Sequence, residues 1–315
     1  MNLPELKPIN QNKLFNYDNF FLSFIELYKN KKLPNKLIFS GRKGIGKATF
    51  AYHLINYILS VGEDFEYNLD SFEINRENKS YNLVLNNSHP NLYIIDLLEN
   101  KKVIEISQIK EMYNFANKSS FNNREKIIFI DNAENLNLSS SSALLKIIEE
   151  PNENIIFILI YDSSKKLLDT VKSRCLKFNF FLSSSNCKNV INKITGTNID
   201  HIISKDLIQP YSTIGDLMNL LNLSSDIDLD LSKINLKNFL ITIIDNNYYK
   251  KNDYIKNSIY KYVEFYFIFL ISLNKSKKKI FYTYDYFVKK INYIKQYNLD
   301  EESFFIEFRN KILHE

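Results

Sequence analysis

Five short apolar runs, separated by longer stretches with helical spacing, mark the first 182 positions. Four of them are almost continuously apolar, which is typical of strands buried on both faces, and the fifth alternates. The runs are Leu37–Phe39, Leu92–Asp96, Lys126–Asp131, Ile155–Tyr161 and the alternating Leu176, Phe178 and Phe180. Strands of this kind that alternate with helices predict an α/β fold, with a parallel sheet covered on both faces.

Between these runs, apolar residues recur three and four positions apart, which predicts amphipathic helices. Residues Glu63–Asn87 are polar and poorly periodic, so we expect them to leave the core as an excursion. The predicted helices are Phe20–Tyr28, one through Ala51, Leu54, Ile55, Ile58 and Leu59, one over Ile106–Ala116, one that starts with caps among Ser139–Ser142 and ends at Pro151, and a short one over Lys165–Val171.

The pattern changes after Phe181. Ser183–Asn186 is predicted to be a linker, and the residues up to 222 form small helices broken at Gly196, Pro210 and Gly215. From about residue 232 the spacing is helical to the end, with apolar faces at Phe239–Ile244 and Ile259–Leu273. An α/β block is therefore followed by an all-helical region.

The amino-acid composition excludes only a few classes of protein. The chain has 315 residues and a net charge of +5, which permits contact with nucleic acid without establishing it. Two cysteines, Cys175 and Cys187, cannot form a four-cysteine zinc site or a disulfide framework, which fits a reducing cytoplasm. The N-terminal residues lack the apolar stretch of a signal peptide, and Phe265–Leu273 is too short to span a bilayer. We expect a soluble, cytoplasmic protein without a membrane partner.

A glycine-rich turn joins the first predicted strand to the helix behind it. Glycines let backbone N–H groups converge on an anion, and the helix N-terminus adds the positive end of its dipole. The spacing matches the phosphate-binding pattern GxxxxGK, except that Ala48 takes the place of the hydroxyl residue that binds Mg²⁺. The candidate nucleotide-binding residues are Gly41, Gly44, Gly46, Lys47, Ala48, Thr49 and Asp131.

Asp131 closes the third strand, where an Asp of a nucleotide-hydrolysing site orients Mg²⁺. The next residue there is normally a Glu that activates water, but here it is Asn132, which cannot take a proton. Glu134 stands two residues too late. Together with Ala48, this predicts little or no ATP hydrolysis. Two alternatives stay open for the loop: it retains nucleotide binding, or it is only a structural turn.

Arg174 lies in Ser173-Arg174-Cys175, just ahead of the fifth strand. An Arg at a domain surface can reach the γ-phosphate held by a neighbouring subunit and stabilise transition-state charge. The alternative is an ordinary surface Arg. The position between two core strands favours the functional interpretation.

The remaining reactive side chains favour structural roles. His53 lies on the helix after the loop, and His89 precedes Pro90 at a strand entry. No Gly-x-Ser-x-Gly turn surrounds Ser139–Ser142, so helix capping is the better account of these serines. Neither cysteine has a matching partner. We expect no metal site.

Over most of residues 15 to 182, the sequence resembles the clamp-loader subunits of bacterial DNA polymerase III, of the AAA+ class. The most specific motif is the Ala-Leu-Leu-Lys-x-x-Glu-Glu-Pro helix. The motifs that carry the resemblance are Leu33–Thr49, His89–Leu92, Ile104–Ile109, Lys126–Glu134, Asn137–Pro151 and Ser173–Cys175. Within the family, the delta-prime type is more similar to this chain than the ATP-hydrolysing gamma and tau types, because of Ala48, Asn132 and the retained Ser-Arg-Cys.

The resemblance implies three domains: an AAA+ P-loop core over 1–182, a small helical lid over 183–228 and a helical collar over 229–315. It implies a mostly non-catalytic, largely non-hydrolysing member of a ring that loads the sliding clamp on primed DNA, with gamma or tau and delta subunits as partners. The chain would be one subunit of a DNA-directed DNA polymerase holoenzyme, with Arg174 facing the ATP of a neighbour.

Two departures from the family limit what is carried over. The four-cysteine zinc module is missing, because Glu63–Asn87 contains no Cys, so no zinc is expected. Ser212–Asp216 lacks the basic residue of a nucleotide sensor, which makes bound ATP doubtful. Whether the Lys275–Lys279 cluster touches DNA stays open, and a solvated helical surface is the simpler account.

Two other functions remain as alternatives. One is an ATP-hydrolysing subunit of the gamma/tau type, which predicts turnover by the isolated chain. The other is a DNA-binding scaffold with a relic nucleotide fold, which predicts DNA affinity without partner subunits.

Overall fold

The computed structural model describes residues 7–99, 101–121, 124–149, 154–273, 277–297 and 299–313. The chain divides into two compact units. One comprises Asn2–Ile191 with Thr213–Asp216, and the other comprises Asn192–Ser212 with Leu217–Glu315. The division into three domains, drawn from the family resemblance, stays a prediction.

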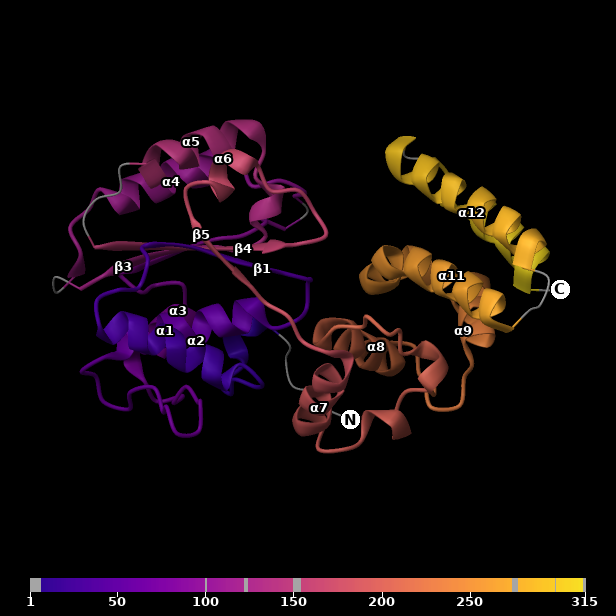
Figure 1. Cartoon of the computed structure of the whole chain (residues 1–315), viewed down its shortest axis with the longest axis horizontal. Coiled ribbons are helices and arrows are strands. Elements are labelled where there is room, and N and C mark those ends of the chain that lie inside the picture. Colours follow the sequence, from indigo (N-terminus) through magenta and orange to yellow (C-terminus); the bar gives the residue numbers. More distant parts are fainter. Residues whose placement is uncertain are drawn as a thin grey trace. The chain divides into compact units, whose positions relative to one another are not determined.

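The first unit contains a five-stranded sheet in which every pairing is parallel (Figure 1). The strand order is β2-β3-β4-β1-β5, so β1 lies between β4 and β5. In that register Ile38 lies opposite Leu159 on one side and Lys177 on the other. The strands are β1 (Lys36–Gly41), β2 (Leu92–Ile95), β3 (Lys126–Ile130), β4 (Ile155–Asp162) and β5 (Leu176–Asn179).

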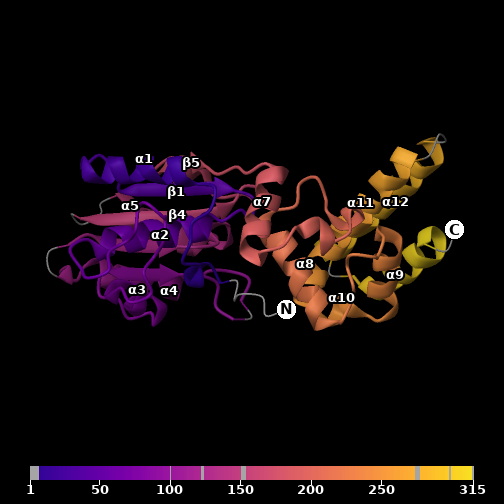
Figure 2. The same cartoon turned by 90° about the horizontal axis from the view of Figure 1, so that it is seen from below.

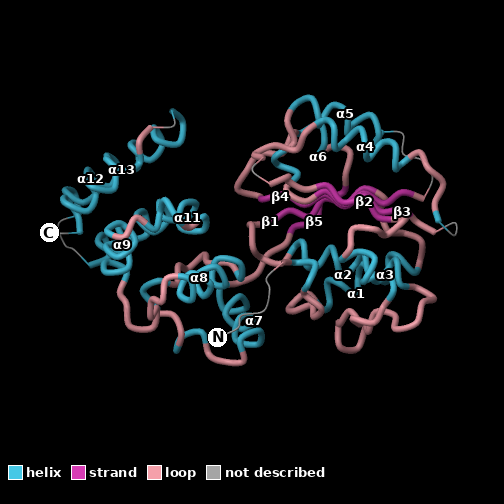
Figure 3. The backbone as a smooth tube through the Cα atoms, turned by 180° about the vertical axis from the view of Figure 1, so that it is seen from behind, coloured by secondary structure: helices cyan, strands magenta, loops and turns pink. Residues whose placement is uncertain are grey.

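Helices cover both faces of this sheet. Figures 1 and 3 show α1, α2 and α3 on one face and α4, α5 and α6 on the other. Each face has its own buried apolar cluster, which is why the inner strands read as continuous apolar runs. The helices of this block are α1 (Asp18–Lys29), α2 (Lys47–Ser60), α3 (Lys79–Leu85), α4 (Ile106–Ala116), α5 (Leu138–Glu149) and α6 (Asp169–Lys172).

The remaining helices follow β5. Within the second unit α11 contacts α9 and α12, as Figure 2 shows from below. Its core is strongly aromatic: Phe267, Phe287, Phe304 and Phe308 are buried against one another. The helices that follow β5 in the chain are α7 (Ser184–Thr195), α8 (Ile214–Asp226), α9 (Leu236–Asp245), α10 (Tyr248–Lys251), α11 (Asp253–Leu273), α12 (Lys277–Tyr297) and α13 (Glu301–Phe308).

Several predicted boundaries were wrong. Ser184 begins α7, so Ser183–Asn186 is not a linker. Gly215 does not break a helix, because it lies in the first turn of α8. The helix predicted over Lys165–Val171 is shorter and later, because a bend at Lys165 and irregular backbone precede its start at Asp169. Residue types that are common in loops are also common at helix starts, so the sequence pattern alone does not tell a loop from a helix start.

The start of α5 also differs from the prediction. The side chain of Asn137 accepts the Ser140 N–H at 2.8 Å, so Asn137 is the cap and the helix begins at Leu138. Ser140 and Ser141 are buried inside the first turns instead. Glu150 and Pro151, predicted to end the helix, lie outside the described residues.

The polar excursion Glu63–Asn87 is more ordered than its sequence suggested. It contains α3, and the Glu63 carboxylate accepts hydrogen bonds from Ser80 N at 3.0 Å and Ser80 Oγ at 2.8 Å. His89 Nε2 lies 3.2 Å from the same hydroxyl. Because Ser80 is fully buried, this Glu–Ser–His contact closes the excursion and does not form a reactive site.

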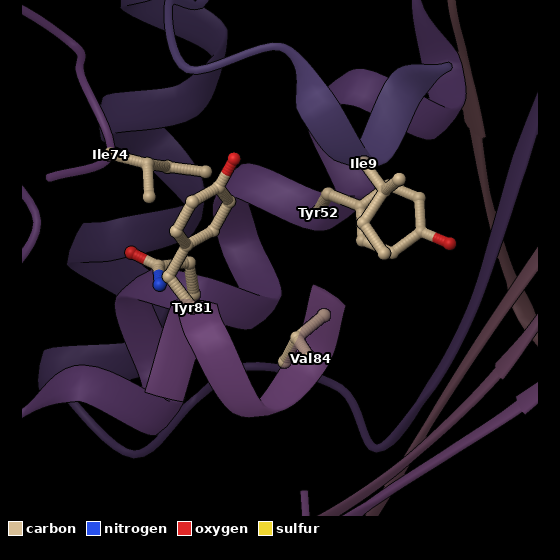
Figure 4. Close-up of a pocket in the computed structure, with 6 residues that line it drawn as sticks. Ile9, Tyr52, Ile74, Tyr81 and Val84 are labelled. Atoms are coloured by element: carbon tan, nitrogen blue, oxygen red, sulfur yellow. The ribbon is translucent and has the colours of Figure 1, made fainter. Parts of the chain in front are cut away.

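Beside α3 lies a small cavity of about 10 Å³, lined by Ile9, Tyr52, Asn56, Ile74, Tyr81 and Val84 (Figure 4). A cavity of that size holds one water at most. It leaves no room for a ligand.

His53 is fully buried on α2. Its ring nitrogens lie 2.9 Å from the Tyr67 hydroxyl and 3.0 Å from the Gln11 carbonyl. Burial lowers the pKa of His53 to about 4. This histidine therefore ties the N-terminal segment and the excursion to α2, in agreement with the structural role predicted for it.

We expect the stability of the chain to fall on acidification because of His53. Its folded pKa of about 4 lies below the ordinary value near 6.5, so the unfolded chain binds the proton better. The stability contribution is present above pH 6.5 and is lost as the pH falls towards 4. Urea denaturation should show about 2 kcal/mol more loss between pH 7 and pH 5 in the native chain than in His53→Gln. Identical pH dependence of the two would contradict this account.

Candidate functional site

The glycine-rich turn connects β1 to α2 at the carboxyl edge of the sheet, where parallel α/β folds bind ligands. Gly44 and Gly46 have φ angles of 83° and 93°, a left-handed conformation that glycine adopts without steric cost. Tyr17 stabilises the turn, because its hydroxyl donates a hydrogen bond to the Ile45 carbonyl at 2.9 Å. Ile45 is itself buried. The turn thus has the expected backbone shape of a phosphate-binding loop.

Lys47 is buried inside this turn. Its ammonium donates to the carbonyls of Gly41 and Arg42, at 2.7 Å each. Burial lowers the pKa of Lys47 to about 8, although the nearby carboxylates of Asp162 and Asp131 oppose the shift. The Lys47 ammonium, which would contact a phosphate, therefore donates hydrogen bonds to two carbonyls of its own loop.

A second segment closes against the loop. The Gly215 N–H, at the start of α8, donates to the Gly44 carbonyl at 2.8 Å. A Cβ built on Gly44 would lie 2.6 Å from Thr213 Oγ1, and one built on Gly215 would lie 2.8 Å from Gly44 Cα. Thr213–Asp216 belongs to the same compact unit as the loop. The two glycines thus allow two backbones to pack directly together.

The two residues after Lys47 offer little to a metal ion. Ala48 has no side-chain oxygen and packs against the apolar core on the α1–α2 face. Thr49 follows it in the first turn of α2, one position away from the usual ligand. The donor set therefore does not fit a Mg²⁺–nucleotide complex of the hydrolysing kind.

Asp131 and Asn132 lie at the carboxyl end of β3. Burial and the neighbouring Asp96 carboxylate raise the pKa of Asp131 to about 6. Asn132 has a φ of 52°, and its amide donates to Asp96 Oδ1 at 2.6 Å. The position that normally carries the base thus holds an amide that is already bonded to a carboxylate.

Glu134 does not replace the missing base. Its side chain is 1% exposed and pairs with Lys165 at 3.4 Å. Its other oxygen accepts the backbone N–H of Asp162 at 3.0 Å. The carboxylate therefore binds the end of β4.

Sequence reasoning missed Asp96 and Asp162, which contribute to the electrostatics around Asp131 and Lys47. One signal was available, because Asp162 ends β4 and Asp96 directly follows β2. The carboxyl ends of parallel strands meet at one edge, so polar residues there converge.

A groove of about 540 Å³ lies beside Tyr17. Its lining combines aromatic rings with side-chain amides from two stretches of the chain. The lining residues are Asn16–Phe20, Asn179–Leu182 and Asn186.

Arg174 lies at the other edge of the sheet. Because β1 and β5 are parallel and Leu37 pairs with Leu176, the residues before β5 start where β1 starts. The loop follows the end of β1, at least four residue rises or roughly 13 Å away. Arg174 is therefore not part of the same constellation as Lys47 and Asp131.

The described residues contain no group of three or more His, Cys, Asp or Glu side chains that could hold a metal ion. None of the described helices is both long and apolar enough to cross a bilayer. The cysteines have no disulfide: Cys187 is buried and Cys175 is partly buried.

A family model described as DNA polymerase III, delta subunit, matches residues 18–184, more than half of the chain. The chain is similar to the DNA polymerase III subunit delta' of Buchnera aphidicola subsp. Schizaphis graminum, at 26% identity over 75% of this chain and 72% of that protein. It is 30% identical to the delta' subunit of Pseudomonas aeruginosa, over 32% of this chain and 31% of that protein.

The gamma subunit of the same Buchnera is 36% identical over 46% of this chain and 40% of its own length. Among solved structures, a DNA polymerase III gamma subunit-related protein from Thermotoga maritima aligns over 90% of this chain and 96% of its own, with a TM-score of 0.50 and 13% identity. This likeness concerns the fold alone. The expected α/β fold, a parallel sheet with a P-loop turn followed by a helical C-terminal region, is confirmed.

The close contact between the loop and Thr213–Gly215 predicts a steep cost for Gly44→Ala. Gly62 is a matched control, because it also has a positive φ of 74° but its Cβ would meet only Arg124, at 3.7 Å. Both alanines carry backbone strain of about 1 kcal/mol or more, and only the one at 44 adds a clash worth roughly 1–3 kcal/mol. Urea denaturation should rank Gly44→Ala as the less stable variant. Equal losses would show that the two segments are not in contact.

Proposed function

The chain belongs to the family described as DNA polymerase III, delta subunit, the clamp-loader type of subunit, and from this premise we propose that it is a delta-prime subunit. In this proposal it is a largely non-hydrolysing AAA+ member of a hetero-oligomeric ring that loads the sliding clamp on primed DNA. It contributes Arg174 to the active site of a neighbour.

The geometry of the loop supports the non-hydrolysing role. Ala48 supplies no ligand for Mg²⁺, and Asn132 supplies no base. Lys47 is bonded to the loop's own carbonyls, and Gly215 is bonded to Gly44. Even with a nucleotide in the loop, the chain would lack the groups for hydrolysis. Bound ATP therefore has no part in the proposed mechanism of this chain.

The position of Arg174 is the observation that carries the proposal of a finger in trans. It lies at the opposite edge of the sheet from its own phosphate loop, which argues against a role at that loop and supports a role towards another chain. Its side chain is 37% exposed, so it is accessible to a partner. A guanidinium placed against a transferring γ-phosphate neutralises charge that develops in the transition state.

The proposed partners follow from the relatives. Subunits named gamma, gamma/tau and tau are similar to this chain, so we propose that gamma or tau holds the ATP that Arg174 faces. The delta subunit, the clamp and primed DNA complete the proposed cytoplasmic complex. A net charge of +5 suits contact with a phosphate backbone through the assembled ring and gives little support to strong unaided DNA binding.

An ATP-hydrolysing subunit of the gamma/tau type is the second candidate. The 36% identity to a gamma subunit favours it. The loss of the ligand at Ala48 and of the base at Asn132 argues against it, and a direct assay separates the two.

Arg174→Ala should lower the ATPase of a loader reconstituted from this chain with its gamma or tau and delta subunits, clamp and primed DNA. ATP hydrolysis at the site that Arg174 serves should slow by about 10³-fold. The total ATPase rate should then fall by the fraction that this site contributes. Lys172→Ala is the matched control, since Lys172 is a nearby, partly exposed cation that pairs with Asp169. An unchanged rate in Arg174→Ala would remove the trans-acting role.

Restoring the two sequence motifs should not create an ATPase. In Ala48→Thr/Asn132→Glu the new carboxylate occupies a backbone position with a φ of 52°, and Lys47 and Gly44 keep their present partners. Phosphate release by the isolated variant with ATP and Mg²⁺ should stay at the background of the native chain. Turnover near 1 s⁻¹ or above by the variant, in the range of ordinary enzymes, would contradict this prediction. Turnover by the native chain itself would favour the gamma/tau type.

A further inference from the structure

Arg174 is held by a specific carboxylate. Its Nε donates to Glu149 Oε1 at 2.6 Å, and its Nη2 contacts the same oxygen at 2.5 Å. On the other side of the guanidinium, Nη1 donates to the Thr170 carbonyl at 3.0 Å. An arginine carries five N–H bonds, so these contacts fix the plane of the group and leave donors for another acceptor.

Glu149 gains little stability from its place on α5. It is the last described residue of α5, and a carboxylate at a helix C-terminus opposes the helix dipole. The pair is also solvent-accessible, with side chains 37% and 48% exposed, and such ion pairs add little to stability. A contribution to folding therefore does not explain why an acidic residue occupies this position.

The chain also uses arginine sparingly. Only five of its 41 basic residues are Arg, at positions 42, 76, 124, 174 and 309. A lysine has a single ammonium on a flexible stem and cannot present one edge to Glu149 while it offers other donors outward. The planar guanidinium at 174 can do both at once.

We propose that Glu149 is a positioning residue: it holds the Arg174 guanidinium in the orientation that meets the nucleotide of the neighbouring subunit. This inference rests on the proposed function of Arg174. A free arginine side chain samples many rotamers, and a misplacement of about 1 Å can cost about 10²-fold in rate. Glu149 removes that freedom before the subunits meet.

The first test reads the orientation itself in the isolated chain, without partners. Five arginines give five Nε–H signals in a ¹H–¹⁵N spectrum, and Arg174→Lys identifies the one of interest. In Glu149→Ala this signal should move towards that of free arginine, and its exchange with water should speed up by about 10-fold, because its charge-assisted hydrogen bond is lost. Asp169→Ala is the matched control, since Asp169 is 98% exposed and pairs with Lys172. It should leave the Arg174 signal unchanged.

The second test is a double-mutant cycle in the reconstituted loader. Glu149→Ala should lower the Arg174-dependent part of the ATPase by about 10-fold and should have no further effect in the Arg174→Ala background. Thermal melting should show that both variants remain folded. Asp169→Ala should leave the rate at its native value.

The outcomes separate the two proposals. An Arg174 signal that is unchanged in Glu149→Ala, or a native or increased rate in that variant while Arg174→Ala is slow, overturns the role of Glu149 and leaves Arg174 as the finger. A native rate in Arg174→Ala overturns the proposed function, and the catalytic purpose of the Glu149 contact falls with it. A signal that moves, together with a rate loss that depends on Arg174, supports both.

Discussion

The parallel pairing of β1 with β4 and β5 is the constraint on which the rest of the protein depends. It is built from the most deeply buried residues of the chain, with Leu37, Ile38 and Phe39 at 0% exposure. Because the strands are parallel, every β-to-α turn lies at one edge and every α-to-β turn at the other. The phosphate loop is thereby assigned to one edge and Arg174 to the other.

At the carboxyl edge, the loop has kept its shape while its polar groups have found partners within the chain. Lys47 bonds to loop carbonyls, Asn132 to Asp96 and Glu134 to the end of β4. Polar groups that are withdrawn from solvent need partners, and these three side chains have them within the chain. A loop of this kind serves well as a rigid support for β1 and the start of α8, whether or not it ever holds a nucleotide.

At the other edge of the sheet, the Arg174 side chain remains exposed to solvent. Arg174 is supported by Glu149 and the Thr170 carbonyl and still has donors that face solvent. The same sheet thus separates a closed site from an open one. This division suits the proposed role, in which the subunit would act on its neighbours more than on a substrate of its own.

The sequence by itself determined the sheet, the phosphate loop and the two missing catalytic groups, because continuous apolar runs, glycine spacing and the residues at 48 and 132 are local features. It also placed Arg174 ahead of the last strand. Helix starts at Leu138 and Ser184 were misjudged, since serine and asparagine suit both caps and loops. Only the tertiary structure brought Gly215 onto Gly44 and Glu149 onto Arg174. These partners are 171 and 25 residues apart in sequence, and no local pattern encodes which distant side chains meet once the sheet has formed.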